Sequence, residues 1–499
     1  MHLSTLLACD LVAVEQNDEL TLLVELTAPT PTAATTRQPA TLQVVLDRSG
    51  SMAGDRLEGA KSALIALVDR LDPADNLGVL AFDDDTQIVV PAGPLTSKTA
   101  VKHAIATVDA GGSTDLSSGY LRGLQEAQRV AGPTGATLLL VSDGHANAGI
   151  TDPGQLGQVA TRARSKNVTT STLGFGLGYD ERLLAALARG GAGNELFAEG
   201  ADTAVALISG EVDGLLTQVA QAASLRLTWT DHVAGISVLN DLPVVGLPDG
   251  AMLELGSFYA GETRRLLVKL DVPGIPALGL TQVATLEFTH VSLPDLVQHT
   301  TTVPVMVNVV PGDQAAGRIP DPKVRSEELF QQTQQAKRES SSLLSRGLVG
   351  EASAMLSQSS AALRAASGGL PPEFAAELCL EADLVQSLAA EASFDAPRAA
   401  KASSMSATAG SRTRGRQTRG GRIVLRCADG CGELALEEWE LQRLLRDLPA
   451  VLARLVRPGR EVHESETALD LSLALGPEHP AHGFFFRGWE HGGFTVGRA

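Results

Sequence analysis

The residues best suited to chemistry stand in a short loop, DRSGS, at positions 47–51. Asp47 ends an apolar, β-branched run that is typical of a buried strand, and from Leu57 onward apolar residues recur at helical spacing. The loop therefore joins a strand to a helix, and its small residues let the backbone curl so that Asp47, Ser49 and Ser51 can converge. One carboxylate and two hydroxyls are hard oxygen donors, which favour Mg²⁺, Mn²⁺ or Ca²⁺ over zinc or copper.

Two later loops offer further oxygen atoms. Thr114 follows a Gly-Gly turn and precedes a second predicted helix, and Asp143 ends a second apolar strand, LLLVSD. A serine-rich turn that caps a helix would explain the first loop by itself. The three loops together, in this order and at these separations, resemble the metal-ion-dependent adhesion site of the von Willebrand factor type A family.

The resemblance covers about residues 40–220. It implies a doubly wound, Rossmann-like sheet with the metal at its carboxyl edge, where the strand order reverses and where open α/β sheets bind ligands. It also implies a site for Mg²⁺ (or Mn²⁺), with an open coordination position that captures an acidic group of a partner protein. Carried over residue by residue, the implied ligands are Asp47, Ser49, Ser51, Thr114 and Asp143.

The function that follows from this resemblance is an intracellular, metal-dependent protein-binding scaffold. An enzyme is the alternative, because a Mg²⁺ ion with an open position can act as a Lewis acid on phosphate esters. The sequence has no Gly-rich phosphate loop, and Asp85 and His145, the nearest acid and base candidates, look like turn residues. We therefore expect no enzyme. A third hypothesis is a partner-recruiting subunit of an ATPase-driven chaperone or metal-insertion system, with a separate motor.

Other polar residues near the predicted ligands are more typical of loop structure than of binding. Asp83, Asp84 and Asp85 are predicted to form a solvated turn within a hairpin. His145 and Asn147, which follow Asp143, are predicted to shape their loop rather than to bind the metal.

The chain has 499 residues, which is too long for one core and indicates about three or four domains. We expect the type A domain at residues 41–222, where strands and helices alternate. Short strands separated by Gly, Pro and Asp fill residues 223–312, which is the rhythm of an antiparallel β-sandwich. Residues 1–40 contain two predicted strands and would complete that sandwich, so that the type A domain is inserted into it.

The remainder is predicted to comprise three parts. Residues 313–400 read as three helices, which could form a small bundle packed against the sandwich. Residues 401–421 are rich in Ser, Gly and Arg, which indicates a flexible basic linker. Residues 422–499 combine strand-like segments with an amphipathic helix, which indicates a small α+β domain of unknown type.

Composition excludes several classes of partner. The net charge of −18 would repel a nucleic-acid backbone or an anionic membrane, and an aromatic content of 4% gives few platforms for stacking bases. No run approaches the ~18 apolar residues that span a bilayer. The first residues lack the basic start of a signal peptide, so the expected location is the cytoplasm.

The four cysteines are too few for a disulfide framework in a chain of this size. Cys9, in a predicted strand, and Cys379 are expected to be buried small hydrophobic residues. Cys427 and Cys431, with two histidines downstream, could suggest zinc, but their spacing matches no standard pattern.

Overall fold

The computed structural model describes residues 1–30, 37–144, 146–198 and 200–411, together with five short strands between residues 423 and 498. The chain divides into two compact units, residues 1–413 and residues 414–499. Across the described part, no helix is both long and apolar enough to cross a membrane.

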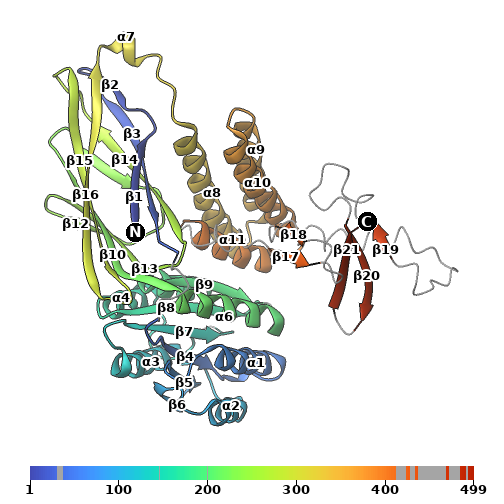
Figure 1. Cartoon of the computed structure of the whole chain (residues 1–499). Coiled ribbons are helices and arrows are strands. Elements are labelled where there is room, and N and C mark those ends of the chain that lie inside the picture. Colours follow the sequence, from blue (N-terminus) through green and yellow to red (C-terminus); the bar gives the residue numbers. More distant parts are fainter. Residues whose placement is uncertain are drawn as a thin grey trace. The chain divides into compact units, whose positions relative to one another are not determined.

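A six-stranded sheet carries the predicted metal loops (Figure 1). Its strands lie in the order β6-β5-β4-β7-β8-β9, and all neighbours are parallel except β5 and β6. The chain passes from β4 to β5 on one side and later returns to β7 on the other side of β4, so the strand order reverses between β4 and β7. The strands are β4 (Thr41–Asp47), β5 (Asn76–Phe82), β6 (Thr86–Pro94), β7 (Ala136–Ser142), β8 (Val168–Phe175) and β9 (Ala192–Ala198).

Helices cover both faces of this sheet. Apolar residues of α1 (Asp55–Arg70), α2 (Lys98–Ala106) and α6 (Ala201–Leu216) share one core with one face. Those of α3 (Leu116–Val130), α4 (Pro153–Arg164) and α5 (Glu181–Gly190) share a second core with the other face. Because both faces are covered, β4 is buried at every position, which explains its continuous apolar run.

Two further sheets pack face to face and share one apolar core. In the first, β3 pairs with β14 over its full length. β3 precedes the type A region in the sequence and β14 follows it, so segments from both sides of that region lie in one sheet. In the second, β2 is parallel to β16 and the other neighbours are antiparallel. The first sheet contains β1 (His2–Leu7), β3 (Asp18–Thr27), β14 (Thr263–Val272) and β11 (Gly235–Val238). The second contains β12 (Val244–Leu247), β13 (Gly250–Tyr259), β10 (Gln218–Trp229), β15 (Gly279–Ser292), β16 (Val297–Val310) and β2 (Leu11–Ala13).

A helical layer follows in the chain and packs on the outer face of the first sheet, where Val324 contacts Leu23 and Leu267. This contact explains why β3 is buried at consecutive positions rather than at alternate ones. The helices are α7 (Gly312–Ala315), α8 (Pro322–Ser345), α9 (Val349–Ser367), α10 (Pro372–Ala392) and α11 (Ala396–Ser411).

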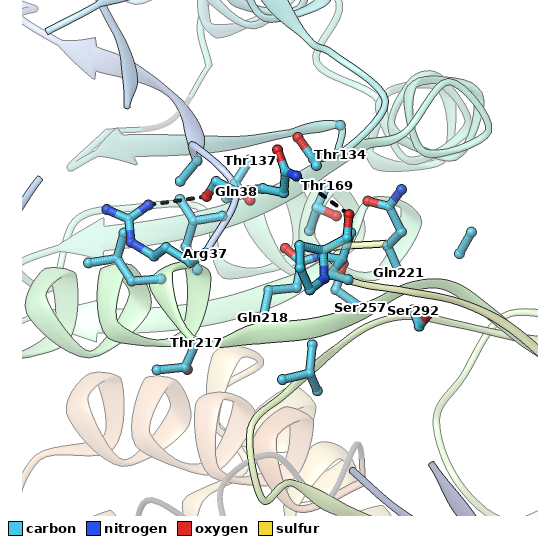
Figure 2. A pocket seen from close by; sticks show the side chains of 18 of the residues that line it. Arg37, Gln38, Thr134, Thr137, Thr169, Thr217, Gln218, Gln221, Ser257 and Ser292 are labelled. Atoms are coloured by element: carbon cyan, nitrogen blue, oxygen red, sulfur yellow. Dashed lines mark hydrogen bonds between the residues drawn. The ribbon is translucent and has the colours of Figure 1, made fainter. Parts of the chain in front are cut away.

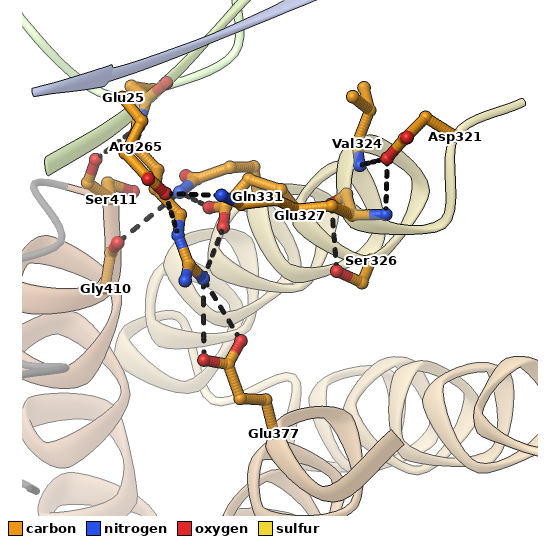
Figure 3. A network of polar contacts seen from close by, with 12 residues as sticks. Glu25, Arg265, Asp321, Val324, Ser326, Glu327, Gln331, Glu377, Gly410 and Ser411 are labelled. Carbon is orange, nitrogen blue, oxygen red and sulfur yellow. Dashed lines mark hydrogen bonds and ion pairs between the residues drawn. The ribbon is translucent and has the colours of Figure 1, made fainter. Parts of the chain in front are cut away.

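Arg265 of β14 joins this layer to the sheet (Figure 3). Its guanidinium lies 3.1 Å from Glu25 of β3, 3.6 Å from Glu327 of α8 and 3.2 Å from Glu377 of α10. Glu327 is fully buried, and Arg265 places an opposite charge beside it. The network therefore fixes two helices against the sheet.

The prediction of a flexible linker from residue 401 is wrong for residues 401–411, which form most of α11. Alanine favours a helix, and the small side chains allow close packing against α8 and β9. Lys401 is buried there, and its Nζ donates to the Tyr179 carbonyl (2.8 Å) and to Glu181 (2.9 Å). The rest of that predicted linker lies outside the described residues.

One predicted boundary and one predicted number of strands also need correction. Helix α6 ends at Leu216 and β10 begins at Gln218, so the predicted end of the type A domain at residue 222 is wrong. Pairing of β10 with β13 and β15 places residues 218–222 in the second sheet instead. The first 30 residues form three strands rather than two, because β1 pairs with β3.

The prediction that Cys9 and Cys379 are buried is wrong. Cys9 follows β1 and does not lie within a strand, and Cys379 lies in α10; both side chains are half-buried. Desolvation at its half-buried position raises the pKa of the Cys9 thiol.

The second unit is described only through its strands. β17 (Ile423–Arg426) pairs with β18 (Glu433–Leu436), and β19 (Ala468–Asp470), β20 (Phe484–Glu490) and β21 (Gly493–Arg498) form an antiparallel sheet. The predicted amphipathic helix and the pair Cys427 and Cys431 lie outside the described residues.

Candidate metal centre

The two predicted aspartate ligands lie at the carboxyl edge of the six-stranded sheet. Asp47 is the last residue of β4, and Asp143 follows directly after β7. Because β4 and β7 are parallel neighbours, their ends lie side by side at the point where the strand order reverses. Asp47 and Asp143 are 0% and 1% exposed, so the fold buries two carboxylates in one place.

Asp47 is held by hydrogen bonds to both of its carboxylate oxygens. The Ser49 backbone N–H donates to Oδ1 (2.8 Å), and the Ser142 hydroxyl donates to Oδ2 (2.6 Å). Desolvation raises the pKa of Asp47; the hydrogen bonds from Ser142 and Ser49 oppose this effect, and the charge of Asp143 adds to it. The net pKa is raised, so a positive charge beside Asp47 would stabilise its ionised form.

The two serine hydroxyls of the first loop connect the aspartates. Ser49 Oγ lies 3.1 Å from Ser51 Oγ, and the Ser51 hydroxyl donates to Asp143 Oδ1 (2.8 Å). The loop continues as a short 3₁₀ turn, η1 (Gly50–Met52), before α1 begins. This turn contains Ser51, whose hydroxyl contacts both Asp143 and the Ser49 hydroxyl.

Thr114 approaches from the loop before α3 and is 4% exposed. Its backbone N–H donates to Asn147 Oδ1 (3.0 Å), and the Asn147 N–H donates to the Thr114 carbonyl (3.1 Å). A methyl group on Gly144 would lie 3.4 Å from Ser51 Oγ and 3.5 Å from Thr114 Oγ1, so these two hydroxyls flank the same point. The loop-shaping role predicted for Asn147 is confirmed, whereas His145 lies outside the described residues.

Asp83 is buried, so the prediction of a solvated turn is wrong for this residue, although Asp84 and Asp85 are exposed. Asp83 Oδ2 lies 3.2 Å from Arg48 Nε and accepts from the Gly112 N–H at 3.2 Å. Its carboxylate thus ties the loop of Asp47 to the loop of Thr114. Asp83 therefore supports the loops that carry the candidate ligands and is not itself one of those ligands.

Sequence reasoning missed two residues of the site. Ser142 was hidden in an apolar strand, although its position directly before Asp143 is a usable signal. Arg56, whose Nη1 lies 2.5 Å from Asp143 Oδ2, left no such signal. Arg56 and Asp143 are 87 positions apart in the sequence, and only the fold brings them together.

The donor set fits a hard divalent cation. All five predicted ligands offer oxygen, two of them as carboxylates and three as hydroxyls, which suits Mg²⁺ or Mn²⁺. Across the described residues there is no group of three or more His, Cys, Asp or Glu side chains that could hold a metal. A cation here would therefore depend on the hydroxyls as well as on the two aspartates.

A separate cavity of about 750 Å³ lies at the opposite end of the strands (Figure 2). Its lining includes Thr41 and Thr137, near the amino ends of β4 and β7, and Gln218 at the start of β10. Gln38 reaches across to the Pro294 carbonyl (3.5 Å). The lining contains none of the predicted metal ligands, so this cavity is not part of the metal site.

A doubly wound sheet with an Asp-x-Ser-x-Ser loop, a threonine loop and an aspartate loop at one edge defines a domain of the von Willebrand factor type A class. The family model of the von Willebrand factor type A domain matches residues 42–208, which confirms the resemblance seen in the sequence. The chain thus contains a von Willebrand factor type A domain.

Similar proteins include the uncharacterized protein sll0103 of Synechocystis sp., 35% identical over 163 residues, which are 33% of this chain and 38% of that protein. The uncharacterized protein YfbK of Escherichia coli (strain K12) is 30% identical over 240 residues, 47% of this chain and 42% of that protein. The chain therefore spans less than half the length of these curated relatives. A solved von Willebrand factor type A structure from Catenulispora acidiphila, 17% identical, covers 78% of this chain and 89% of its own with a TM-score of 0.63, a likeness of fold alone.

Proposed function

We propose that this protein is a metal-dependent protein-binding scaffold. In this proposal Asp47, Ser49, Ser51, Thr114 and Asp143 hold Mg²⁺ (or Mn²⁺), and an acidic group of a partner protein completes the coordination shell. The observation that carries it is the convergence of three loops, with these side chains, at the carboxyl edge between β4 and β7. Type A domains often act as metal-dependent modules of protein interaction, which agrees with the family match.

The chemistry of the donors supports capture of an acid. Mg²⁺ prefers six oxygen ligands in octahedral geometry and seldom takes all of them from one protein. Three neutral hydroxyls satisfy the ion without cancelling its charge, so an incoming carboxylate gains from the charge that remains. Ser49, Ser51, Thr114 and Asp143 lie on loops beyond the strand ends, and Ser51 is exposed, so a partner can approach the site there.

We propose binding rather than catalysis, since the sequence has no Gly-rich phosphate loop and Asp85, the nearest acid candidate, is exposed on its turn. We also propose that the protein is located in the cytoplasm, as expected from the sequence. Release of phosphate from phosphate esters by the purified chain with Mg²⁺ would favour the enzymatic alternative. Co-purification with an ATPase would favour the role as a recruiting subunit of a chaperone or metal-insertion system.

Isothermal titration calorimetry of the full chain tests the metal site. Wild type should bind Mg²⁺ and Mn²⁺, and Asp47→Ala should abolish the binding because it removes one of two charged ligands. Asp213→Ala is the matched control, since it removes an exposed carboxylate that pairs with Arg70. Equal Mg²⁺ affinity of wild type and Asp47→Ala would contradict the site assignment.

Affinity purification from the native host tests the partner. The immobilised chain should retain a protein in Mg²⁺ and release it when a chelator is added, and Asp47→Ala should not retain it. A partner that resists the chelator and also binds Asp47→Ala would show that recognition uses another surface.

A further inference from the structure

The charges of the candidate site are unequal. Asp47 and Asp143 are both buried, and Asp47 accepts hydrogen bonds from Ser49 and Ser142 but forms no ion pair with any of the described residues. Among the described residues, Arg56 is the basic side chain that pairs with Asp143. Asp143 therefore has a cationic partner, whereas Asp47 has none among the described residues.

Arg56 stands where a helix disfavours positive charge. It is the second residue of α1, and the N-terminus of a helix carries a partial positive charge from its unpaired N–H groups. Gly54, the preceding cap, gives this end no side-chain hydrogen bond. The arginine thus gains nothing from its helix, and its contacts explain its position: Nη1 lies 2.5 Å from Asp143 Oδ2 and donates to the Ser51 carbonyl at 3.2 Å.

The pair is also asymmetric in exposure. The Arg56 side chain is 43% exposed, whereas that of Asp143 is 0% exposed. An exposed arginine has a long, flexible stem and can leave its partner at low cost, while the carboxylate is fixed by its burial and by the hydroxyl of Ser51. The guanidinium is therefore the member that moves when a stronger cation arrives.

We propose that Arg56 is the exchangeable counter-ion of the metal site, which neutralises Asp143 when no metal is bound and competes with the metal for it. This inference rests on the proposed function. A divalent ion within a few ångströms of Asp143 repels the guanidinium, so binding of the metal includes the cost of displacing it. Arg56 thereby weakens metal binding while it stabilises the metal-free fold.

A different role for Arg56 makes the opposite prediction. Carboxylates that bind a metal are commonly oriented by a further hydrogen bond, and loss of that partner weakens the binding of the metal. If Arg56 only orients Asp143, its removal should lower the affinity for Mg²⁺. If it competes, its removal should raise that affinity.

The test is calorimetric titration of the full chain with Mg²⁺, combined with thermal melting in chelator. Arg56→Gln should bind Mg²⁺ about three- to tenfold more tightly than wild type and melt at a lower temperature in chelator. Arg56→Lys, which keeps the charge, should stay close to wild type in affinity. Arg56→Ala is a second variant that removes the charge, and it should shift the affinity in the same direction as Arg56→Gln.

Arg70→Gln is the matched control. Arg70 lies on the same helix, is 41% exposed and pairs with an aspartate, but it is roughly 21 Å along the helix axis from Arg56 and beyond the range of screened charges. It should not change the affinity for Mg²⁺. Unchanged or weaker binding by Arg56→Gln and Arg56→Ala would overturn the inference, whereas a wild type that binds no Mg²⁺ would instead refute the proposed function.

Discussion

Two buried clusters of charged side chains differ in how their charges are balanced. In the helical layer, Lys337 of α8 contacts Glu381 of α10, and each side chain is 1% exposed. Neighbours complete this pair: the Gln334 amide donates to Glu381 (2.8 Å), and Lys337 donates to the Ser406 hydroxyl of α11 (2.9 Å). This cluster links three helices, and its ion pair sets one positive charge against one negative charge among the described contacts.

At the edge of the six-stranded sheet, Asp47 and Asp143 are buried to the same degree, but the cation that pairs with Asp143 is the half-exposed Arg56. A buried charge without an equal partner is costly, and proteins retain such groups where a ligand supplies the missing charge. The comparison separates a cluster that serves the fold from one that serves binding. It also predicts opposite responses when a charge is removed from each.

The largest effect is expected in the balanced cluster. Lys337→Met leaves Glu381 buried without its cation, and the free energy of unfolding should fall by about 3–5 kcal/mol. Urea denaturation of the full chain measures this loss. The double variant Lys337→Met/Glu381→Leu should recover most of the stability, because a buried pair can be replaced by apolar side chains of similar volume. A single variant as stable as wild type would show that the pair is not a structural element.

An intermediate effect is expected when charge is removed from the unbalanced cluster. Asp47→Asn keeps the size of the side chain and an acceptor for the Ser49 N–H, but it relieves the repulsion between two carboxylates. In chelator its melting temperature should equal or exceed that of wild type.

The same variant should lose the response to metal. Wild type should gain about 2.7 kcal/mol of stability when free Mg²⁺ is roughly a hundred times its Kd, and Asp47→Asn should gain almost none. A large loss of stability for Asp47→Asn in chelator would mean that Asp47 serves the fold and would remove the contrast between the clusters.

The difference between the clusters also shows what a sequence can reveal. The ligand loops were predictable because a continuous apolar run ends directly at Asp47 and again at Asp143, which locates two strand ends without knowledge of their neighbours. Ordered donors in a fixed pattern then identified the family. These signals lie in short stretches of sequence, so they can be recognised without a three-dimensional structure.

Features that depend on distant partners were not predictable. Residues 401–411 look solvated because they are small and polar, yet Lys401 is buried by contacts with Tyr179 and Glu181. The Ser404 and Thr408 hydroxyls donate to Glu195, more than 200 positions earlier in the chain. Composition indicates how much a segment can bury, but it does not show which partners neutralise its polar groups.

The smallest effect is expected at Thr114, and it tests whether neutral ligands matter beside the charged ones. The backbone of Thr114 is held by two hydrogen bonds with Asn147, so Thr114→Ala should leave the loop in place. The variant loses one neutral oxygen and no charge. Its affinity for Mg²⁺ should fall about two- to tenfold, corresponding to a contact of roughly 0.5–1.5 kcal/mol.

Thr114→Ser is the matched control, because it keeps the hydroxyl and removes only a methyl group; it should bind Mg²⁺ as wild type does in the same calorimetric titration. Capture of a partner should be more sensitive to Thr114→Ala than binding of the metal is, if the hydroxyl joins the shell when an acidic group arrives. A complete loss of Mg²⁺ binding in Thr114→Ala, equal to that of Asp47→Ala, would instead show that charge is not what distinguishes this site. In that case the hydroxyls, and not the unbalanced aspartates, would determine the affinity for the cation.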